Sequence, residues 1–379
     1  MTLPPLQGHH TAREAVARAW SRGRLPQVLL LHGPPGVGKQ RFAHWIGQLL
    51  VCLTPSEAGP CGECRECRLT ERVEHPDIHW YVPLPRPKKR GTPEREAEAL
   101  EELRAGWIQE ARERPFRSTW SEEVTGLHLG TIRNLNRRAR TPPGTGPRQL
   151  FIIADAEQLV AQESAQEAAN ALLKTLEEPA PGTHFILTSS EPGRLLPTIR
   201  SRASGLHLPA LPGRDVATFL VTFLEADPEV AERAARLSGG SVGRALGFLP
   251  DGEEDGPLER IRKEAFHLVR SALSPRSGDR FAQALAYPPS GARGLLELLG
   301  FMEGWLRDLA AAMVGAGDRV LNQDALKWLT KTAQGGIHPT GPARALNRVE
   351  EARLQASGNV NPQLLLAGLL MDLHQILRE

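Results

Sequence analysis

The chain has 379 residues, a length that suggests two or three domains. It is 40% hydrophobic and 24% charged, and its formal net charge is only +2, so composition gives no argument for nucleic-acid binding. No apolar run approaches the ~20 residues of a membrane span, and the N-terminus lacks the charged and apolar regions of a signal peptide. We therefore expect a cytoplasmic protein with no membrane partner.

The first strong pattern is a strand, a glycine-rich turn and a helix, predicted over residues 28–31, 33–38 and 41–50 after a helix at 9–22. The turn fits G-x-x-x-x-G-K, in which backbone N–H groups bind phosphate oxygens and the lysine reaches the β- and γ-phosphates. The next position is usually Ser or Thr, whose hydroxyl binds Mg²⁺, but here it is Gln40, which fits that role poorly. The candidate nucleotide-binding residues of this loop are Gly33, Pro34, Pro35, Gly36, Val37, Gly38, Lys39 and Gln40.

The four cysteines of the chain are clustered, at Cys52, Cys61, Cys64 and Cys67. Two C-x2-C steps that share one cysteine can aim three thiolates at a point, and the remaining thiolate can complete the tetrahedron that Zn²⁺ prefers. Two disulfides or four unrelated thiols are the alternatives, and a cytoplasmic setting opposes disulfides. His75 is a substitute ligand candidate. A closed four-cysteine site has no open position, so the predicted zinc is structural.

A second strand is predicted over residues 77–82, and residues 83–125 are interpreted as an insertion or a mobile excursion. This segment holds a proline-rich basic loop at 83–90 and a charged helix at 93–113. Lys89 and Arg90 could contact DNA phosphates, although a solvated charge run is the commoner explanation. The predicted apolar stripe of the helix is Leu100, Leu103 and Trp107.

A carboxylate follows the next predicted strand. After a helix over residues 129–140, a buried strand at 149–154 ends on Asp155, and the carboxyl edge of a parallel sheet is where ligand chemistry is usually placed. In ATPases this aspartate holds Mg²⁺ and the following glutamate polarises the attacking water. Here Ala156 follows, and Glu157 stands one position later, so we expect its side chain to point elsewhere.

The remaining elements favour a parallel α/β sheet followed by an all-helical region. A helix, a strand, a short helix and an edge strand are predicted over 164–178, 182–187, 195–201 and 205–208. Three short helices at 213–249 and about five at 257–379 follow, on either side of an acidic linker at 251–256. The predicted domains are 1–210, which contains the cysteine module (51–76) and the insertion (83–125), then 211–250 and 257–379.

Several of these stretches together resemble the bacterial clamp-loader subunits of the AAA+ class, over roughly residues 8–250. They are the loop at 33–39, the cysteine module, His75-Pro76-Asp77, the segment Asn170–Pro179 and the segment Thr198–Arg202. The last two are highly specific, whereas a lone glycine loop would not be. The resemblance implies a P-loop parallel sheet with an inserted zinc module, a small helical lid domain and a C-terminal all-α collar domain.

Within that family the chain resembles the delta-prime type and not the gamma/tau motors. The motors carry Lys-Thr in the loop and Asp-Glu after the strand, where this chain has Lys39-Gln40 and Asp155-Ala156. Both departures remove hydrolysis chemistry and leave the fold intact. An active ATPase of the gamma/tau type is the alternative, and binding of ATP or ADP is left open because Lys39 and the backbone of the loop are present.

The resemblance also implies roles for individual residues. Arg202 corresponds to an arginine finger, which stabilises charge on the γ-phosphate of ATP bound by a neighbouring subunit, although Ala203 replaces the cysteine of that motif. Arg244 corresponds to the second sensor and residues 189–190 to the first. The alternatives are a surface salt bridge for Arg202, a capping or packing role for Arg244, and a turn-capping role for Asp155.

The implied partners are the gamma/tau and delta subunits, in a ring of five that places a sliding clamp on primer-template DNA. Two other classes are weaker alternatives. A P-loop kinase would need a phosphoacceptor pocket, which the sequence does not reveal. A zinc-dependent DNA-binding protein would need a basic recognition helix beyond residues 133–140.

Overall fold

Residues 3–87, 92–116, 125–159, 165–252, 254–289, 292–356, 358 and 360–379 are described by the structure, a computed structural model. They form two compact units, an N-terminal unit that ends at Leu246 and a C-terminal unit from Gly247 to Glu379. The finer division into three domains stays a prediction. The predicted DNA contact of Lys89 and Arg90 lies outside the described residues. Among the residues described, no helix is both long and apolar enough to cross a membrane.

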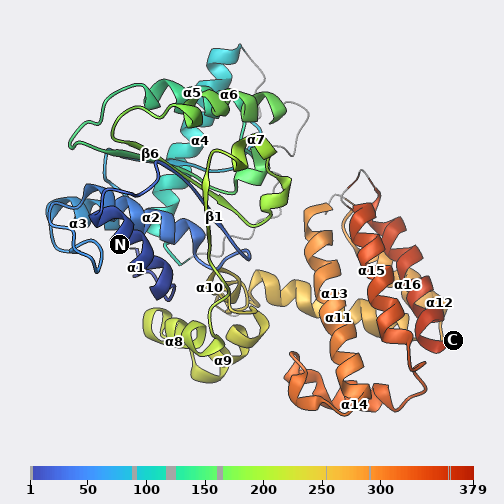
Figure 1. The fold of residues 1–379 in the computed structure, drawn as a ribbon. Helices are drawn as coiled ribbons and strands as arrows, with labels where there is room; N and C mark the ends of the chain where they lie inside the picture. Colours follow the sequence, from blue (N-terminus) through green and yellow to red (C-terminus); the bar gives the residue numbers. More distant parts are fainter. Residues whose placement is uncertain are drawn as a thin grey trace. The chain divides into compact units, whose positions relative to one another are not determined.

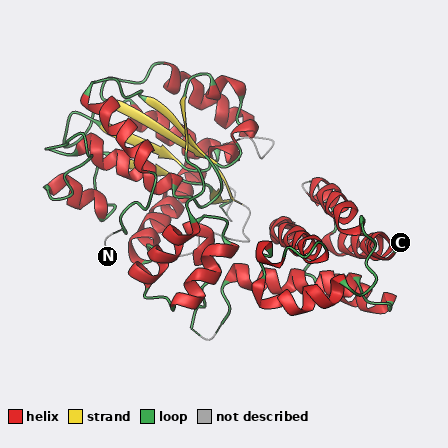
Figure 2. Cartoon of the chain, turned by 60° about the horizontal axis from the view of Figure 1, so that its bottom comes forward, coloured by secondary structure: helices red, strands yellow, loops and turns green. Residues whose placement is uncertain are grey.

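The N-terminal unit is built on a five-stranded sheet in the order β2-β5-β6-β1-β7, in which every neighbouring pair is parallel (Figure 1). The strands are β1 (Val28–His32), β2 (Ile78–Tyr81), β5 (Gln149–Ile153), β6 (Thr183–Ser189) and β7 (Ser204–His207). Helices lie on both faces of the sheet (Figure 2), so the predicted α/β class is confirmed. Because β1 pairs with β6, the loop that leaves β1 opens beside the end of β6.

Alternate residues of β1 are buried on opposite faces of the sheet, which is the period of a strand. Val28 and Leu30 belong to one apolar core cluster, whereas Leu29 and Leu31 belong to another. All four side chains are buried, which explains why the strand reads as a continuous apolar run. The helices that contribute to these clusters include α1 (His10–Ser21), α2 (Lys39–Val51), α5 (Leu129–Ala139) and α6 (Ala165–Glu177).

Helix α4 (Pro93–Glu113) packs on the sheet, so a mobile excursion does not describe this part of residues 83–125. Leu100 is 2% exposed, and the rings of Trp107 and Trp80 lie 5.7 Å apart between centroids. Leu103 is exposed, so the predicted apolar stripe was wrong at that position. The helix contacts α5 and the edge strand β2, and the side chain of Leu103 lies outside the strip that these contacts bury. The short strands β3 (Leu84–Pro85) and β4 (Thr125–Gly126) flank the helix in sequence and pair with each other.

Four short α-helices follow β6 in the described part of the N-terminal unit, and three of them fall within the predicted range of 213–249. Asp227 caps one of these three, because its side chain accepts hydrogen bonds from the N–H groups of Glu229 and Val230. The four are α7 (Pro197–Arg200), α8 (Gly213–Leu224), α9 (Pro228–Leu237) and α10 (Val242–Leu246).

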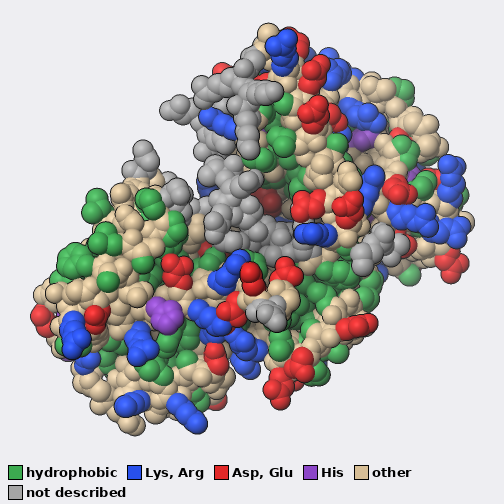
Figure 3. All heavy atoms as spheres, turned by 180° about the vertical axis from the view of Figure 1, so that it is seen from behind, with side chains coloured by type: hydrophobic (Ala, Val, Ile, Leu, Met, Phe, Trp, Pro, Cys, Tyr) green, Lys and Arg blue, Asp and Glu red, His purple; other side chains and the backbone are tan. Residues whose placement is uncertain are grey.

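The described part of the C-terminal unit is helical, with six α-helices where about five were predicted. They are α11 (Pro257–Ala272), α12 (Ser277–Ala286), α13 (Ala292–Met313), α14 (Leu326–Ala333), α15 (Gly341–Ala356) and α16 (Pro362–Arg378). Leu298, Leu299 and Met302 of α13 are fully buried, so this helix lies at the centre of the unit's core. On the face of the chain drawn in Figure 3, basic and acidic side chains are intermixed, as the net charge of +2 leads one to expect.

Candidate functional site

The glycine loop between β1 and α2 has a backbone that needs its glycines. Gly36 and Gly38 have φ angles of 73° and 98°, a region that other residues rarely adopt. A Cβ atom on Gly33 would lie 2.0 Å from the carbonyl oxygen of Leu208, which follows β7. The strand, loop and helix thus form as the sequence predicts, and the loop passes directly against the neighbouring strand end.

Lys39 has no unused hydrogen-bond donor in this loop. Its ammonium group donates to the carbonyl oxygens of Gly33 and Pro34, at 2.9 and 2.8 Å, and to the hydroxyl of Ser190, at 2.9 Å. An ammonium has three protons, and these three acceptors use them all. Burial lowers the pKa of Lys39, while the carboxylates of Asp155 and Glu157 oppose the shift.

Gln40 and Asp155, the residues at the two predicted metal-binding positions, contact each other. The Gln40 amide donates to the Asp155 carboxylate at a long 3.4 Å. Asp155 has a φ of 46°, in the left-handed region, and its N–H donates to the hydroxyl of Thr188 on β6. The residue that replaces the usual Ser or Thr of the loop therefore uses the Asp155 carboxylate as its acceptor.

Glu157 does not point elsewhere, so that expectation was wrong. The left-handed backbone at Asp155 turns the chain into a short 3-10 helix (Ala156–Leu159) and brings Glu157 back to the end of β6. Its Oε1 accepts a hydrogen bond from the N–H of Ser190 at 3.0 Å. Its Oε2 is buried without a hydrogen-bond partner among the described residues. No local sequence signal reveals this position, because it depends on the strand beside it.

Helix α10, which carries Arg244, begins against the glycine loop. The N–H of Gly243 donates to the carbonyl of Gly36 at 2.9 Å. A Cβ atom on Gly36 would lie 2.3 Å from the hydroxyl of Ser241. The segment predicted as the second sensor is therefore in backbone contact with the loop, while the role of Arg244 itself stays a prediction.

The four cysteine sulfurs converge as predicted. They all lie within 4.8 Å of one another, and none of the four is in a disulfide. The N–H groups of Cys61, Cys64 and Cys67 point at the sulfurs of Cys52, Cys61 and Cys64, at 3.3 to 3.4 Å. Hydrogen bonds from Thr54 and from backbone N–H groups lower the pKa of Cys61 to about 6. Four sulfur donors gathered in this way fit a metal ion, and the disulfide alternative does not fit.

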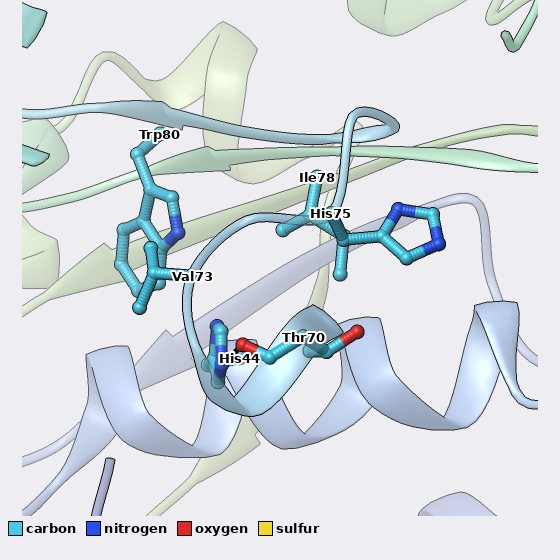
Figure 4. Close-up of a pocket in the computed structure, with 6 residues that line it drawn as sticks. All are labelled: His44, Thr70, Val73, His75, Ile78 and Trp80. Carbon is cyan, nitrogen blue, oxygen red and sulfur yellow. Dashed lines mark hydrogen bonds between the residues drawn. The ribbon is translucent and has the colours of Figure 1, made fainter. Parts of the chain in front are cut away.

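His75 lies outside this cluster, because both of its ring nitrogens have other partners. Nε2 lies 3.0 Å from the Glu66 carboxylate, and Nδ1 accepts from the N–H of Asp77. Figure 4 shows the imidazole pointing away from His44 and Trp80, which line the same small pocket. His75 is therefore a support of the cysteine module and not one of the gathered ligands.

His44 ties the cysteine module to helix α2. Its Nε2 is 2.8 Å from the carbonyl oxygen of Thr70, on helix α3 (Arg65–Glu71), which carries Cys67. Burial lowers the pKa of His44 to about 3. The imidazole thus stays neutral and serves as a buried hydrogen-bond donor between α2 and α3.

Arg202 lies apart from the loop, just after α7. Its Nη1 donates to the carbonyl oxygen of Thr198 at 2.7 Å, and its Nη2 pairs with the carboxylate of Glu177 at the end of α6. The side chain is 31% exposed. The structure therefore brings together the predicted residues of the glycine loop, Asp155 and the Arg244 segment, and it leaves Arg202 and the cysteines as separate sites.

Comparison with known proteins identifies the family. The profile described as "DNA polymerase III, delta subunit" matches residues 8–212. The DNA polymerase III subunit delta' of Escherichia coli is 30% identical over 367 residues, which cover 96% of this chain and 94% of that protein. The Bacillus subtilis subunit of the same name is 25% identical, over 93% of this chain and 92% of that protein. The Pseudomonas aeruginosa subunit delta' is 34% identical over 58% of this chain, an alignment that spans only 55% of that protein. The chain belongs to the DNA polymerase III subunit delta' family.

Proposed function

We propose that this chain is a cytoplasmic, non-motor subunit of a bacterial clamp loader that assists ATP-dependent loading of a sliding clamp onto primed DNA. The observation that carries the proposal is the alignment with the E. coli subunit delta' over 96% of the chain. The proposed partners are the gamma/tau and delta subunits, in a ring of five, with the clamp and primer-template DNA reached through the complex. Residues 257–379 would be the collar domain that joins the subunits, and 211–250 the lid.

We infer that the chain does not hydrolyse ATP. The Mg²⁺-binding hydroxyl is replaced by Gln40, the water-activating carboxylate is replaced by Ala156, and the protons of Lys39 are bonded within the chain. Losing the metal ligand and the general base should each lower the rate by powers of ten. Bound nucleotide would also have to displace Ser190 from Lys39, so we propose that the loop is empty or weakly occupied.

We propose that the chemistry of this subunit lies at Arg202, as an arginine finger for ATP on a neighbouring motor subunit. A partly exposed guanidinium can engage a phosphate that another chain binds, whereas the buried Lys39 ammonium cannot. Arg244 and residues 189–190 would then hold the shape of the loop instead of sensing a phosphate.

We propose a structural zinc ion held by Cys52, Cys61, Cys64 and Cys67. The metal would cross-link the segment between α2 and α3. With four protein ligands it would have no open coordination position for catalysis. Sulfur ligands in a tight cluster favour Zn²⁺ among the common divalent ions.

One observation favours a second candidate function, an active ATPase of the gamma/tau type. The carboxylate of Glu157 is close enough to Lys39 to raise the pKa of the lysine. One of its oxygens is buried without a described hydrogen-bond partner. A relocated carboxylate could in principle activate water. Hydrolysis by the isolated chain that is lost in Glu157→Gln and kept in Glu178→Gln, a substitution of an exposed glutamate elsewhere in the unit, would establish this function and overturn ours.

The test of the leading proposal is reconstitution. The chain should co-assemble with the gamma/tau and delta subunits of its own organism, and the loader that lacks it should not place a clamp on primed DNA. Clamp loading at the same rate with and without the chain would contradict the proposal.

A further inference from the structure

The ion pair between Arg202 and Glu177 joins two helices of the N-terminal unit. Glu177 is the last residue of α6, and Arg202 follows α7 by two residues. One terminal nitrogen of the guanidinium is bound by the Glu177 carboxylate and the other by the Thr198 carbonyl. Two elements of the chain thus fix the position of one long side chain.

The N–H donors of the Arg202 guanidinium are only partly used within the chain. A guanidinium has five N–H donors. The Nε–H is buried without a described acceptor, one N–H of Nη1 bonds Thr198 and one of Nη2 bonds Glu177. Nη1 also lies 3.5 Å from the Ser201 hydroxyl, which is the longest contact of this guanidinium, while the second N–H of Nη2 has no acceptor among the described residues. A phosphate that replaced the long Ser201 contact would meet one N–H group on each terminal nitrogen, as bidentate recognition requires.

We propose that Glu177 is a positioning residue for Arg202. Together with the Thr198 carbonyl, its carboxylate holds the guanidinium in place, and the second N–H of Nη2 and the weakly bonded second N–H of Nη1 then meet the phosphate of a nucleotide on the neighbouring subunit. This inference rests on the proposed function. A free arginine side chain loses rotamer freedom when it engages a phosphate, whereas a side chain that is already held has less freedom to lose.

Two other roles of the pair make different predictions. Glu177 lies at the C-terminal end of α6, where a carboxylate is unfavourable and a cation favourable, so Arg202 could simply stabilise the helix end. That role predicts lower stability of the chain with no change in ATP turnover by the loader. Alternatively, Glu177 could withdraw Arg202 from the phosphate, which predicts faster turnover when the carboxylate is removed.

The experiment uses the complete reconstituted loader with clamp and primed DNA. Arg202→Ala defines how much of the ATPase kcat depends on Arg202. Glu177→Ala should remove about nine tenths of that dependent part, as a side chain that is no longer held in place would. Glu177→Gln, which keeps an oxygen acceptor, should retain about a third of it. The adjacent, exposed Glu178→Ala is the matched control and should match the wild-type loader.

The double variant Glu177→Ala/Arg202→Ala should equal Arg202→Ala alone, because Glu177 acts only through the arginine. The KM for ATP should stay near the wild-type value in every variant, and size-exclusion chromatography verifies assembly. A Glu177→Ala loader that turns over ATP like Glu178→Ala, or faster than wild type, overturns the inference. If Glu177→Ala does not assemble, a wild-type rate for Glu177→Gln overturns it. An Arg202→Ala loader with unchanged kcat overturns the proposed finger role first, and the inference with it.

Discussion

The glycine loop and the Arg202 region each present a cation that an ATPase would direct at a phosphate. In the loop, Lys39 is 5% exposed and its three protons are bonded to groups of the same chain. At the end of α6, the Arg202 side chain is 31% exposed and only part of its donor capacity is used. A sequence motif therefore predicts which residues lie together, but the hydrogen bonds that each cation already makes decide which of them can still bind a phosphate.

The cysteine module extends this comparison, because its four sulfurs lie within 4.8 Å of one another and none of them is in a disulfide. Cys67→Ser should abolish binding of the proposed zinc ion and lower the free energy of unfolding by several kcal/mol, on the order expected for a structural site. Metal content by atomic absorption and urea unfolding measure the two effects. His75→Ala is the control, since His75 lies outside the sulfur cluster, and it should retain the metal. A wild-type protein that is purified without metal and is no more stable than Cys67→Ser would contradict the proposed zinc site.

Lys39→Ala tests whether the lysine serves the fold. The substitution leaves the Gly33 and Pro34 carbonyls without this buried donor, and we expect it to cost about 2–4 kcal/mol of stability, measured by urea unfolding. Lys39→Met, which keeps most of the apolar stem, should lose only slightly less. A Lys39→Ala protein as stable as the wild type would mean that these hydrogen bonds contribute nothing.

The smallest expected effect is a pH dependence that arises at His44. The folded imidazole has a pKa of about 3 because it is buried, while the unfolded one titrates near 6.5. Between these values the unfolded state binds more protons, so the stability that His44 contributes is complete above pH 6.5 and is lost as the pH falls. Replacement by Gln should flatten the slope of stability against pH, between pH 6.5 and 5.5, by up to about 1.4 kcal/mol per unit. Urea unfolding at the two pH values gives this slope for each protein. The same slope of stability against pH in the wild type and in His44→Gln would refute this assignment.

The features that sequence predicts well here are local ones. The glycine loop needs only a strand, three glycines and a helix in succession, and the cysteine cluster needs four residues within one short segment. Both depend only on spacing along the chain, so the sequence pattern is sufficient to predict their geometry. The parallel sheet also follows from the alternation of apolar strands and helices, since covered strands must be apolar on both faces.

The features that sequence could not give depend on neighbours in space. Ser190 meets Lys39 only because β6 lies beside β1, and Glu157 turns inward only because Asp155 adopts a left-handed backbone. Leu103 was predicted to be buried and is exposed, because its side chain lies outside the strip of α4 that the contacts with α5 and β2 bury. The ion-pair partner of Arg202 could likewise not be predicted, since Glu177 is remote in sequence.

The most direct test of the central claim compares Lys39→Ala with Arg202→Ala in the reconstituted loader, each verified for assembly. Arg194→Ala, which removes an exposed arginine with an ion pair to Glu191, is the matched control. We predict that Arg202→Ala lowers the DNA-stimulated ATPase severalfold, while Lys39→Ala and Arg194→Ala leave it near the wild-type rate. A loader whose DNA-stimulated ATPase falls severalfold with Lys39→Ala and is unchanged with Arg202→Ala would contradict the account.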